Sequence, residues 1–275
     1  MYSCFAFLLV SYQIYWNFLF EQPIFNYQYY QYYVSIHISS INYYVIPDTG
    51  STEIWIYTPN IPPNSTPHNI SYIDRTVMGY QAASTMQIGE ITILDFPITF
   101  VNDSTQLYSI RSDGIMGISY SSMLATIILA KYGSFSIKLK DAQGIGHFSI
   151  GDTANFIHRF PIVSHNYWSV MVNQIWYDNF PLLLNETTAI IDSGTSSIIG
   201  SVFDFMSVIP CGFHKELKFN IGGVNYSLLG NEYVFNCECM VESSSYTTAL
   251  ILGDTFLRKY FVKFTRDSIF IDIFS

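Results

Sequence analysis

The sequence predicts an all-β protein built from two similar β-rich halves with few short helices. Three observations support this prediction. Short apolar runs recur between clusters of Gly, Pro, Asn and Ser, which is the pattern of strands joined by turns. Aromatic residues make up 17% of the chain, and such side chains cover pleated sheet surfaces well. A motif of Asp, a hydroxyl residue and Gly follows an apolar run at Asp48 and again, 144 positions later, at Asp192.

The first half is predicted to contain strands, one hairpin and one helix. Alternating or β-branched and aromatic residues predict strands at 29–38, 43–46, 53–57, 91–94 and 98–101. Residues 59–67 are rich in Pro, Asn and Ser and are expected to form a loop. Residues 70–89 are expected to fold as a hairpin. Residues 123–131 are mostly apolar and lack Pro and Gly, so they are predicted to be helical.

The second half is predicted to repeat this plan. Short strands are expected at 135–139 and 147–150, before the second half begins, and within it at 168–175, 261–264 and 269–274. A helix is expected at 201–208, and a hairpin at 217–229 with Gly222 and Gly223 at its turn. In each half the Asp motif is followed, after a similar separation, by an apolar run that ends in Gly, at Gly117 and at Gly253. This correspondence predicts an internal duplication.

Composition and charge exclude several function classes. The formal net charge is −9 with only 12 Lys and Arg, and no basic run occurs, which argues against a nucleic-acid partner. The six histidines are scattered, with no His-Glu-x-x-His motif and no nucleophile elbow. We therefore expect no metal and no cofactor.

The N-terminal segment and the glycosylation sequons point to the secretory pathway. Residues 1–20 carry no charge and have an apolar stretch at 4–10, so a signal peptide is expected, with an uncleaved membrane anchor as the alternative. No later stretch is long and apolar enough to span a membrane. Five glycosylation sequons begin at Asn64, Asn69, Asn102, Asn185 and Asn225. We expect a secreted or a lysosomal or vacuolar protein.

Four cysteines are present in the chain. The simplest interpretation is one disulfide from Cys211 to either Cys237 or Cys239, and the alternative is that these three thiols are free.

The paired Asp motifs predict a specific chemistry. Two aspartates brought close together cannot both ionise cheaply, so they share one proton. Such a pair can hold a water molecule, activate it with the ionised carboxylate, and hydrogen-bond a carbonyl with the protonated one. The glycines at 50 and 194 would let backbone N–H groups approach the carboxylates. Nearby hydroxyls could orient the carboxylates, and these belong to Thr49, Ser51, Ser193 and Thr195.

Ordered features along the chain carry a family resemblance. Asp48-Thr49-Gly50-Ser51 precedes Trp55, Tyr72 precedes Gly79 in the predicted hairpin, and an Asp-Gly-Ile-Met-Gly run occupies 113–117. Tyr167-Trp168, the second Asp loop at 190–196 and a Leu-Gly-Asp-Thr-Phe-Leu-Arg run at 252–258 follow. Together these features resemble those of the pepsin-like aspartic peptidases over 29–273.

The resemblance implies a bilobal pepsin-like acid protease fold, with an N-terminal lobe at 29–147 and a C-terminal lobe at 148–275. It implies an aspartic endopeptidase, a hydrolase that cleaves proteins at acidic pH next to bulky hydrophobic residues. The catalytic residues would be Asp48 and Asp192. Substrate would contact Tyr72 on a mobile flap together with Gly50, Gly194, Thr195 and Ile115, while Thr49, Ser51, Ser193 and Trp55 would support the site. The partner would be an extended peptide or protein substrate, and the chain is expected to be monomeric.

Some features of this sequence depart from the family pattern. Pro47 replaces a residue that can donate its backbone N–H, and the stretch between Trp55 and Tyr72 is short. The flap tip at 73–76 lacks the glycines of the family and carries charge. These departures motivate an alternative, in which the chain is a catalytically impaired homologue that binds a peptide or a protein.

Overall fold

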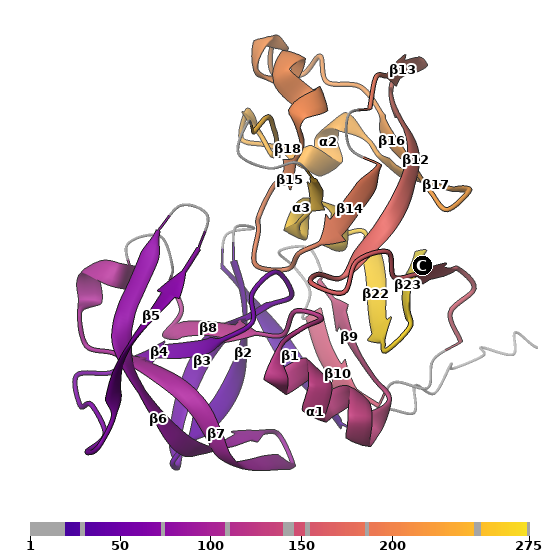
Figure 1. The fold of residues 1–275 in the computed structure, drawn as a ribbon. Helices are drawn as coiled ribbons and strands as arrows, with labels where there is room; N and C mark the ends of the chain where they lie inside the picture. Colours follow the sequence, from indigo (N-terminus) through magenta and orange to yellow (C-terminus); the bar gives the residue numbers. More distant parts are fainter. Residues whose placement is uncertain are drawn as a thin grey trace, which may run out of the picture.

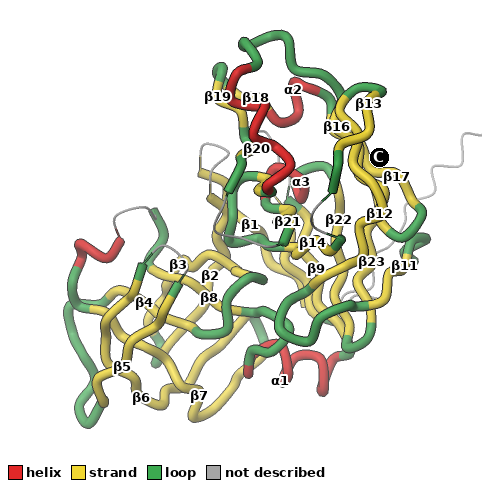
Figure 2. The backbone as a smooth tube through the Cα atoms, turned by 45° about the horizontal axis from the view of Figure 1, so that its top comes forward, coloured by secondary structure: helices red, strands yellow, loops and turns green. Residues whose placement is uncertain are grey.

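The computed structural model describes residues 20–27, 31–72, 75–107, 111–139, 146–151, 155–184, 187–244 and 249–273. The expected signal peptide, except Phe20, therefore lies outside the described residues, as do Cys4 and the sequon at Asn185. Two β-rich lobes are joined through a sheet to which both halves of the chain contribute (Figure 1). Strands predominate and helices are few and short, so the predicted all-β class is confirmed (Figure 2).

The first half contains ten strands, one 3₁₀ helix and one α-helix among the described residues. Their bounds are β1 Phe20–Tyr27, β2 Gln31–Ile38, β3 Ile41–Asp48, β4 Ile54–Tyr57, β5 Thr66–Ser71, β6 Thr76–Ile88, β7 Ile91–Val101, η1 Ser104–Leu107, β8 Gly114–Gly117, α1 Met123–Tyr132, β9 Ser134–Lys138 and β10 Gly146–Ile150.

The second half continues from β11 to β23 within the described residues. Its elements are β11 Arg159–Pro161, β12 Ser169–Tyr177, β13 Phe180–Leu182, β14 Thr188–Ile191, β15 Ile198–Ile199, η2 Ser201–Val208, β16 Leu217–Ile221, β17 Val224–Leu228, α2 Gly230–Tyr233, β18 Val234–Phe235, β19 Glu238–Cys239, β20 Val241–Glu242, β21 Leu250–Leu252, α3 Asp254–Leu257, β22 Tyr260–Thr265 and β23 Ser268–Ile273.

Sheet topology repeats between the two halves, which confirms the predicted duplication. In the first half β3 runs parallel to β8, and β8 runs antiparallel to β4. In the second half β14 runs parallel to β21, and β21 runs antiparallel to β15. Asp48 ends β3 and Asp192 follows β14, so each aspartate occupies the same place in its three-strand unit.

A sheet shared by both halves joins the lobes. The strand order of the large sheet is β11-β23-β22-β9-β10-β1-β2-β3-β8-β4-β7-β6-β5, so β22 and β23 from the end of the chain pair beside β9. The predicted lobe boundary between 147 and 148 falls inside β10. Trp168 fills the core beside this sheet: it is fully buried, its indole N–H donates to the Ile118 carbonyl at 2.8 Å, and its ring lies 5.1 Å from that of Phe264.

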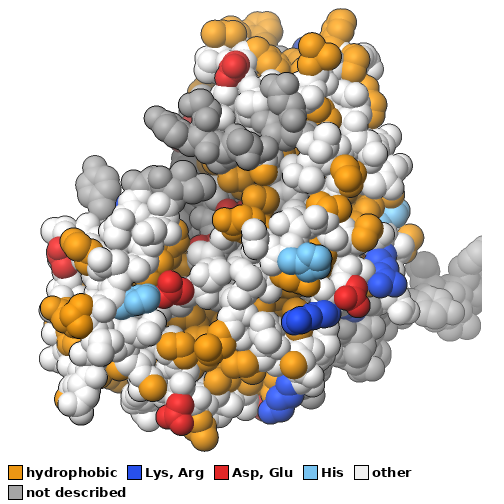
Figure 3. All heavy atoms as spheres, in the orientation of Figure 1, with side chains coloured by type: hydrophobic (Ala, Val, Ile, Leu, Met, Phe, Trp, Pro, Cys, Tyr) orange, Lys and Arg blue, Asp and Glu red, His pale blue; other side chains and the backbone are white. Residues whose placement is uncertain are grey.

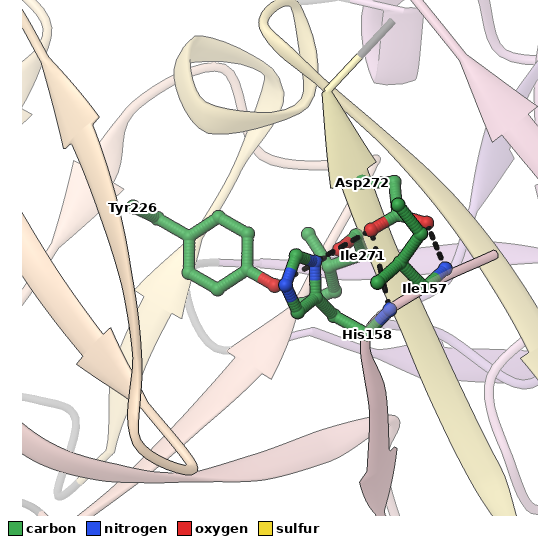
Figure 4. A network of polar contacts seen from close by, with 5 residues as sticks. All are labelled: Ile157, His158, Tyr226, Ile271 and Asp272. Carbon is green, nitrogen blue, oxygen red and sulfur yellow. Dashed lines mark hydrogen bonds and ion pairs between the residues drawn. The ribbon is translucent and has the colours of Figure 1, made fainter.

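A buried carboxylate fixes the connection between the halves to this sheet. Asp272 on β23 is 7% exposed and accepts from the backbone N–H of Ile157 at 2.6 Å. It also pairs with the imidazole Nδ1 of His158 at 2.7 Å, while the neighbouring Tyr226 hydroxyl donates to the Ile271 carbonyl (Figure 4). These contacts attach the segment that leads into the second half to the last strand, β23.

Most predicted elements are present, with some differences. The hairpin at 217–229 has Gly222 and Gly223 in left-handed conformations (φ 54° and 93°), as a two-residue turn requires. The predicted helix at 123–131 is α1, which begins after the Ser122 cap. The strands predicted at 91–94 and 98–101 form one strand, β7. The helix predicted at 201–208 is a 3₁₀ helix with non-helical dihedral angles at Phe203. None of the described helices has both the length and the apolar character needed to cross a bilayer.

The structure contains a disulfide between Cys211 and Cys237, whose Cα atoms lie 5.1 Å apart. Cys239 is a free, partly buried thiol. Of the two pairings that the sequence leaves open, the fold therefore selects Cys237.

Candidate active site

The two aspartates of the repeated motif meet between the lobes. A hollow lies between the lobes, with acidic side chains visible inside it (Figure 3). A Cβ atom added to Gly50 would lie 2.6 Å from the carboxyl carbon of Asp192, and one added to Gly194 would overlap the carboxylate of Asp48. Each carboxylate therefore packs directly over the glycine of the other loop, and only glycine leaves room for this approach.

Reciprocal hydrogen bonds lock the two loops together. The Thr49 hydroxyl donates to the Ile191 carbonyl at 2.8 Å and accepts from the backbone N–H of Ser193 at 2.9 Å. In the opposite direction the Ser193 hydroxyl donates to the Pro47 carbonyl and accepts from the backbone N–H of Thr49. Because Thr49 and Ser193 are buried, these bonds are shielded from water and hold the carboxylates in a fixed relative position.

Each carboxylate also receives donors from its own loop. The Gly50 N–H donates to Asp48 Oδ1 at 2.8 Å, and the Gly194 N–H donates to Asp192 Oδ1 at 2.9 Å. The Thr195 hydroxyl donates to Asp192 Oδ2 at 2.7 Å. Gly50, Gly194 and Thr195, which were expected to contact substrate, thus donate hydrogen bonds to the two carboxylates.

Asp48 lies in an environment that disfavours its charge. Burial raises the pKa of Asp48 to about 7, and the neighbouring Asp192 charge contributes in the same direction. The hydrogen bond from the Gly50 N–H lowers this pKa but does not offset burial. The pair therefore retains a proton throughout the acidic range.

Pro47 fits this strand without loss of a ladder hydrogen bond. Pairing of β3 with β2 ends at Val45, two residues before Pro47. On the other side the Asp48 carbonyl accepts from the Ile118 N–H, so by strand alternation the backbone of Pro47 faces away from β8. Its carbonyl points to the second Asp loop, where it accepts from Ser193. A proline is tolerated here because no backbone partner lies opposite its nitrogen.

The predicted flap hairpin lies over the first Asp loop. We call β5, Tyr72 and the first part of β6 the flap hairpin; residues 73 and 74, which were expected to form its tip, lie outside the described residues. The Tyr72 hydroxyl accepts from the indole N–H of Trp55 at 2.9 Å. Burial raises the pKa of the Tyr72 phenol, and the charge of Asp48 adds to this shift. Ile115, 6% exposed, packs in the apolar cluster that Tyr72 borders.

A third carboxyl group, to which the sequence analysis gave no role, is electrostatically coupled to the pair. Asp254 is 2% exposed, and its backbone N–H donates to the Thr195 carbonyl at 2.7 Å. Burial raises its pKa well above the usual range; Arg258 opposes this shift, while Asp192 and Asp48 add to it. Its place directly after the Gly that ends the second apolar run was the available signal.

Comparisons with known proteins agree with this geometry. The family model described as eukaryotic aspartyl protease matches residues 60–209 and 202–273. Pepsin A of Bos taurus is 27% identical to this chain over 315 aligned positions, which cover 90% of this chain and 84% of the relative. Pepsin A of Callithrix jacchus is 26% identical, with coverages of 90% and 81%. Pregnancy-associated glycoprotein 2 of Bos taurus is 24% identical, with coverages of 81% and 75%. Since the family model spans most of its length, the chain belongs to the eukaryotic aspartyl proteases.

Proposed function

We propose that the chain is an aspartic endopeptidase that hydrolyses peptide bonds in proteins with a water molecule held between Asp48 and Asp192. The observation that carries this proposal is the face-to-face packing of the two carboxylates over each other's glycines, fixed by the reciprocal Thr49 and Ser193 hydrogen bonds. Preorganised groups of this kind need no reorganisation when charge develops in the transition state.

In the proposed mechanism the pair carries one proton. The ionised carboxylate removes a proton from the water as its oxygen attacks the peptide carbonyl carbon. The protonated carboxyl, which burial favours at Asp48, donates a hydrogen bond to the carbonyl oxygen. Proton transfer to the amine nitrogen then lets the C–N bond break, and the pair regains its starting protonation state. Activity is expected to be highest at acidic pH, because Asp48 loses its proton as the pH rises toward its pKa of about 7.

The proposed substrate is an extended peptide that lies between the lobes and hydrogen-bonds through its backbone, as an added strand does. Tyr72 would close over it, and Gly50, Gly194 and Thr195 would line the scissile bond. The apolar cluster under the flap hairpin, which includes Ile115, supports a preference for bulky hydrophobic residues. We further propose a monomer that travels the secretory pathway. The disulfide and the four sequon asparagines among the described residues, all of which are exposed, support this route.

The test is digestion of a denatured protein substrate between pH 3 and 7, with and without a statine-containing peptide inhibitor. Asp48→Asn and Asp192→Asn are each expected to lower kcat by about 10²–10⁴-fold, as loss of a general acid or base does. The matched control is Asp95→Asn, which alters an exposed aspartate in β7 and should leave kcat unchanged. Cleavage that resists both the inhibitor and the dyad variants would contradict the proposal.

The alternative function, that of an impaired homologue that binds peptides, is tested with the same parent chain and the same inhibitor. Calorimetric titration with the inhibitor measures binding without catalysis. Inhibitor binding that is lost in Asp192→Asn, with no cleavage by the parent chain at any pH, would favour the alternative over the endopeptidase.

A further inference from the structure

The flap hairpin rests on a small apolar cluster of its own. β5 is the outermost strand of the large sheet and pairs only with β6 among the described strands. Beneath it lies a cluster separate from the main core, made of Ile46, Trp55, Ile70, Val77, Val101 and Ile115. Ile70 and Val77 face each other across the hairpin and are the hairpin's only buried contribution to this cluster. Because so few of its side chains are buried, polar contacts can determine the position of the hairpin relative to the rest of the lobe.

One such contact joins the hairpin to the first Asp loop. His68 on β5 and Glu53, the residue before β4, approach with Nε2 and Oε2 2.6 Å apart. A carboxylate can only accept here, so the imidazole N–H donates to it. Both side chains are about one-third exposed, at 32% and 35%.

Glu53 is in turn attached firmly to the strand that neighbours Asp48. Its carbonyl accepts from the backbone N–H of Gly117 at 3.0 Å. Gly117 pairs with Asp48 across the β3–β8 ladder, and the next residue, Ile118, donates its N–H to the Asp48 carbonyl at 2.8 Å. His68 therefore connects the hairpin, through one side chain and one backbone hydrogen bond, to the strand beside the catalytic aspartate.

The opposite strand of the hairpin is held at the same level. The side-chain amide of Gln106 accepts from the backbone N–H of Met78 at 2.6 Å and donates to its carbonyl at 3.0 Å. Met78 lies opposite Asn69, one rung from His68. The His68–Glu53 and Gln106–Met78 contacts thus hold neighbouring residue pairs of the hairpin. Tyr72 follows these pairs at the end of β5.

We propose that His68 is a positioning residue for peptide hydrolysis. By donating to Glu53 it fixes the position of β5 relative to the first Asp loop, so that Tyr72 is held at the indole N–H of Trp55, where substrate is proposed to bind. This proposal rests on the proposed function. A role for His68 in fold stability alone would not change substrate binding selectively.

The chain offers a matched control for this contact. His147 on β10 and Glu21 on β1 form a second His–Glu pair, with exposures of 35% and 30%, in the sheet shared by both halves. Loss of this pair should affect stability much as loss of the His68 pair does, but it should not reach the flap hairpin.

The kinetic test compares His68→Ala, His68→Gln and His147→Ala. Exposed pairs of this kind contribute up to about 1 kcal/mol, so His68→Ala should raise KM about two- to fivefold with kcat nearly unchanged. His68→Gln keeps an N–H donor for Glu53 and should restore most of the lost KM. An unchanged KM in His68→Ala, or an equal rise in His147→Ala, would overturn the proposal.

Hydrogen exchange tests the same contact without catalysis. The amides of Thr66 and of residues 69–71 should exchange faster in His68→Ala than in the parent chain, and His147→Ala should leave them unchanged. If the parent chain cleaves nothing, the proposed function fails, but this measurement still shows whether the His68–Glu53 contact holds the hairpin. Unchanged exchange at these amides in His68→Ala would show that the contact does not hold the hairpin.

Discussion

Asp48 combines deep burial with a role that requires it to change charge. The side chain is 6% exposed and faces a second carboxylate, and the hydrogen bond from the Gly50 N–H does not compensate for the lost water. The shift to a pKa of about 7 is therefore a statement about stability as well as about catalysis. The same environment that keeps a proton on the pair in acid makes the pair costly to ionise near neutrality.

Replacing Asp48 with Asn should flatten the pH dependence of stability. The folded-state pKa lies above the ordinary value of 3.8, so the folded chain binds more protons than the unfolded chain between about pH 4 and pH 7. The free energy of unfolding of the parent chain should fall over this window by up to a few kcal/mol, on the order that such a shift implies. Asp48→Asn should lose this part of the slope.

Urea unfolding followed by tryptophan fluorescence at pH 4, 5.5 and 7 would measure the effect. Asp95→Asn, at an exposed site, serves as the control and should keep the slope of the parent chain. An identical pH dependence in Asp48→Asn and the parent chain would contradict the assignment.

Among the elements, the turn between β2 and β3 carries avoidable strain. Pairing of Ile38 with Ile41 leaves a two-residue turn, and Ser39 and Ser40 occupy left-handed conformations with φ of 49° and 71°. Such turns favour Asn-Gly because only Gly adopts positive φ without a steric penalty. Both positions are occupied by serine, so the turn carries this steric penalty twice.

Ser40→Gly should raise the free energy of unfolding by about 0.5–1 kcal/mol, because relief of the left-handed penalty exceeds the added entropy of glycine in the unfolded chain. Thermal or urea unfolding measures the gain. Ser71→Gly, at an exposed position in β5, is the control and should lower stability, since glycine weakens a regular strand. Equal effects of the two substitutions would argue against strain at the turn.

At the scale of the whole molecule, the two halves are joined by the pairing of β22, near the end of the chain, with β9 of the first half. Asp272 belongs to the last strand and accepts hydrogen bonds from Ile157 and His158 in the segment that leads into the second half (Figure 4). Three donor atoms converge on this buried carboxylate, since the His158 backbone N–H also lies 3.3 Å away. The segment that leads into the second half is thus attached to the last strand by a carboxylate that lies outside the repeated motifs.

Asp272→Asn should lower the free energy of unfolding by about 1–3 kcal/mol, because the amide NH₂ would face an N–H donor and leave it unsatisfied. Urea unfolding measures the loss. Glu21→Gln at the exposed His147 pair should cost less than about 1 kcal/mol. A smaller loss of unfolding free energy in Asp272→Asn than in Glu21→Gln would contradict this account of the Asp272 contacts.

Local patterns made much of the fold predictable. The hairpin at Gly222 and Gly223 follows from turn chemistry, and α1 follows from an apolar run that begins after Ser122. β1 was missed because Pro23 interrupts its pattern and because its first residues pair with β10, more than a hundred residues away, although its end pairs with the adjacent β2. The break predicted within β7 was wrong, since Asp95 adopts a left-handed conformation at an irregular register and the strand continues past it.

The candidate site divides in the same way. The sequence by itself determined the repeated Asp, hydroxyl and Gly pattern, because each of the two loops is a strand-to-turn junction formed by residues that are adjacent in sequence. Only the tertiary structure decided that Cys237 rather than Cys239 pairs with Cys211, that Pro47 lies where no N–H is needed, and that His68 reaches Glu53. These outcomes depend on distances between segments remote in sequence, and no local pattern of apolar and polar residues encodes them.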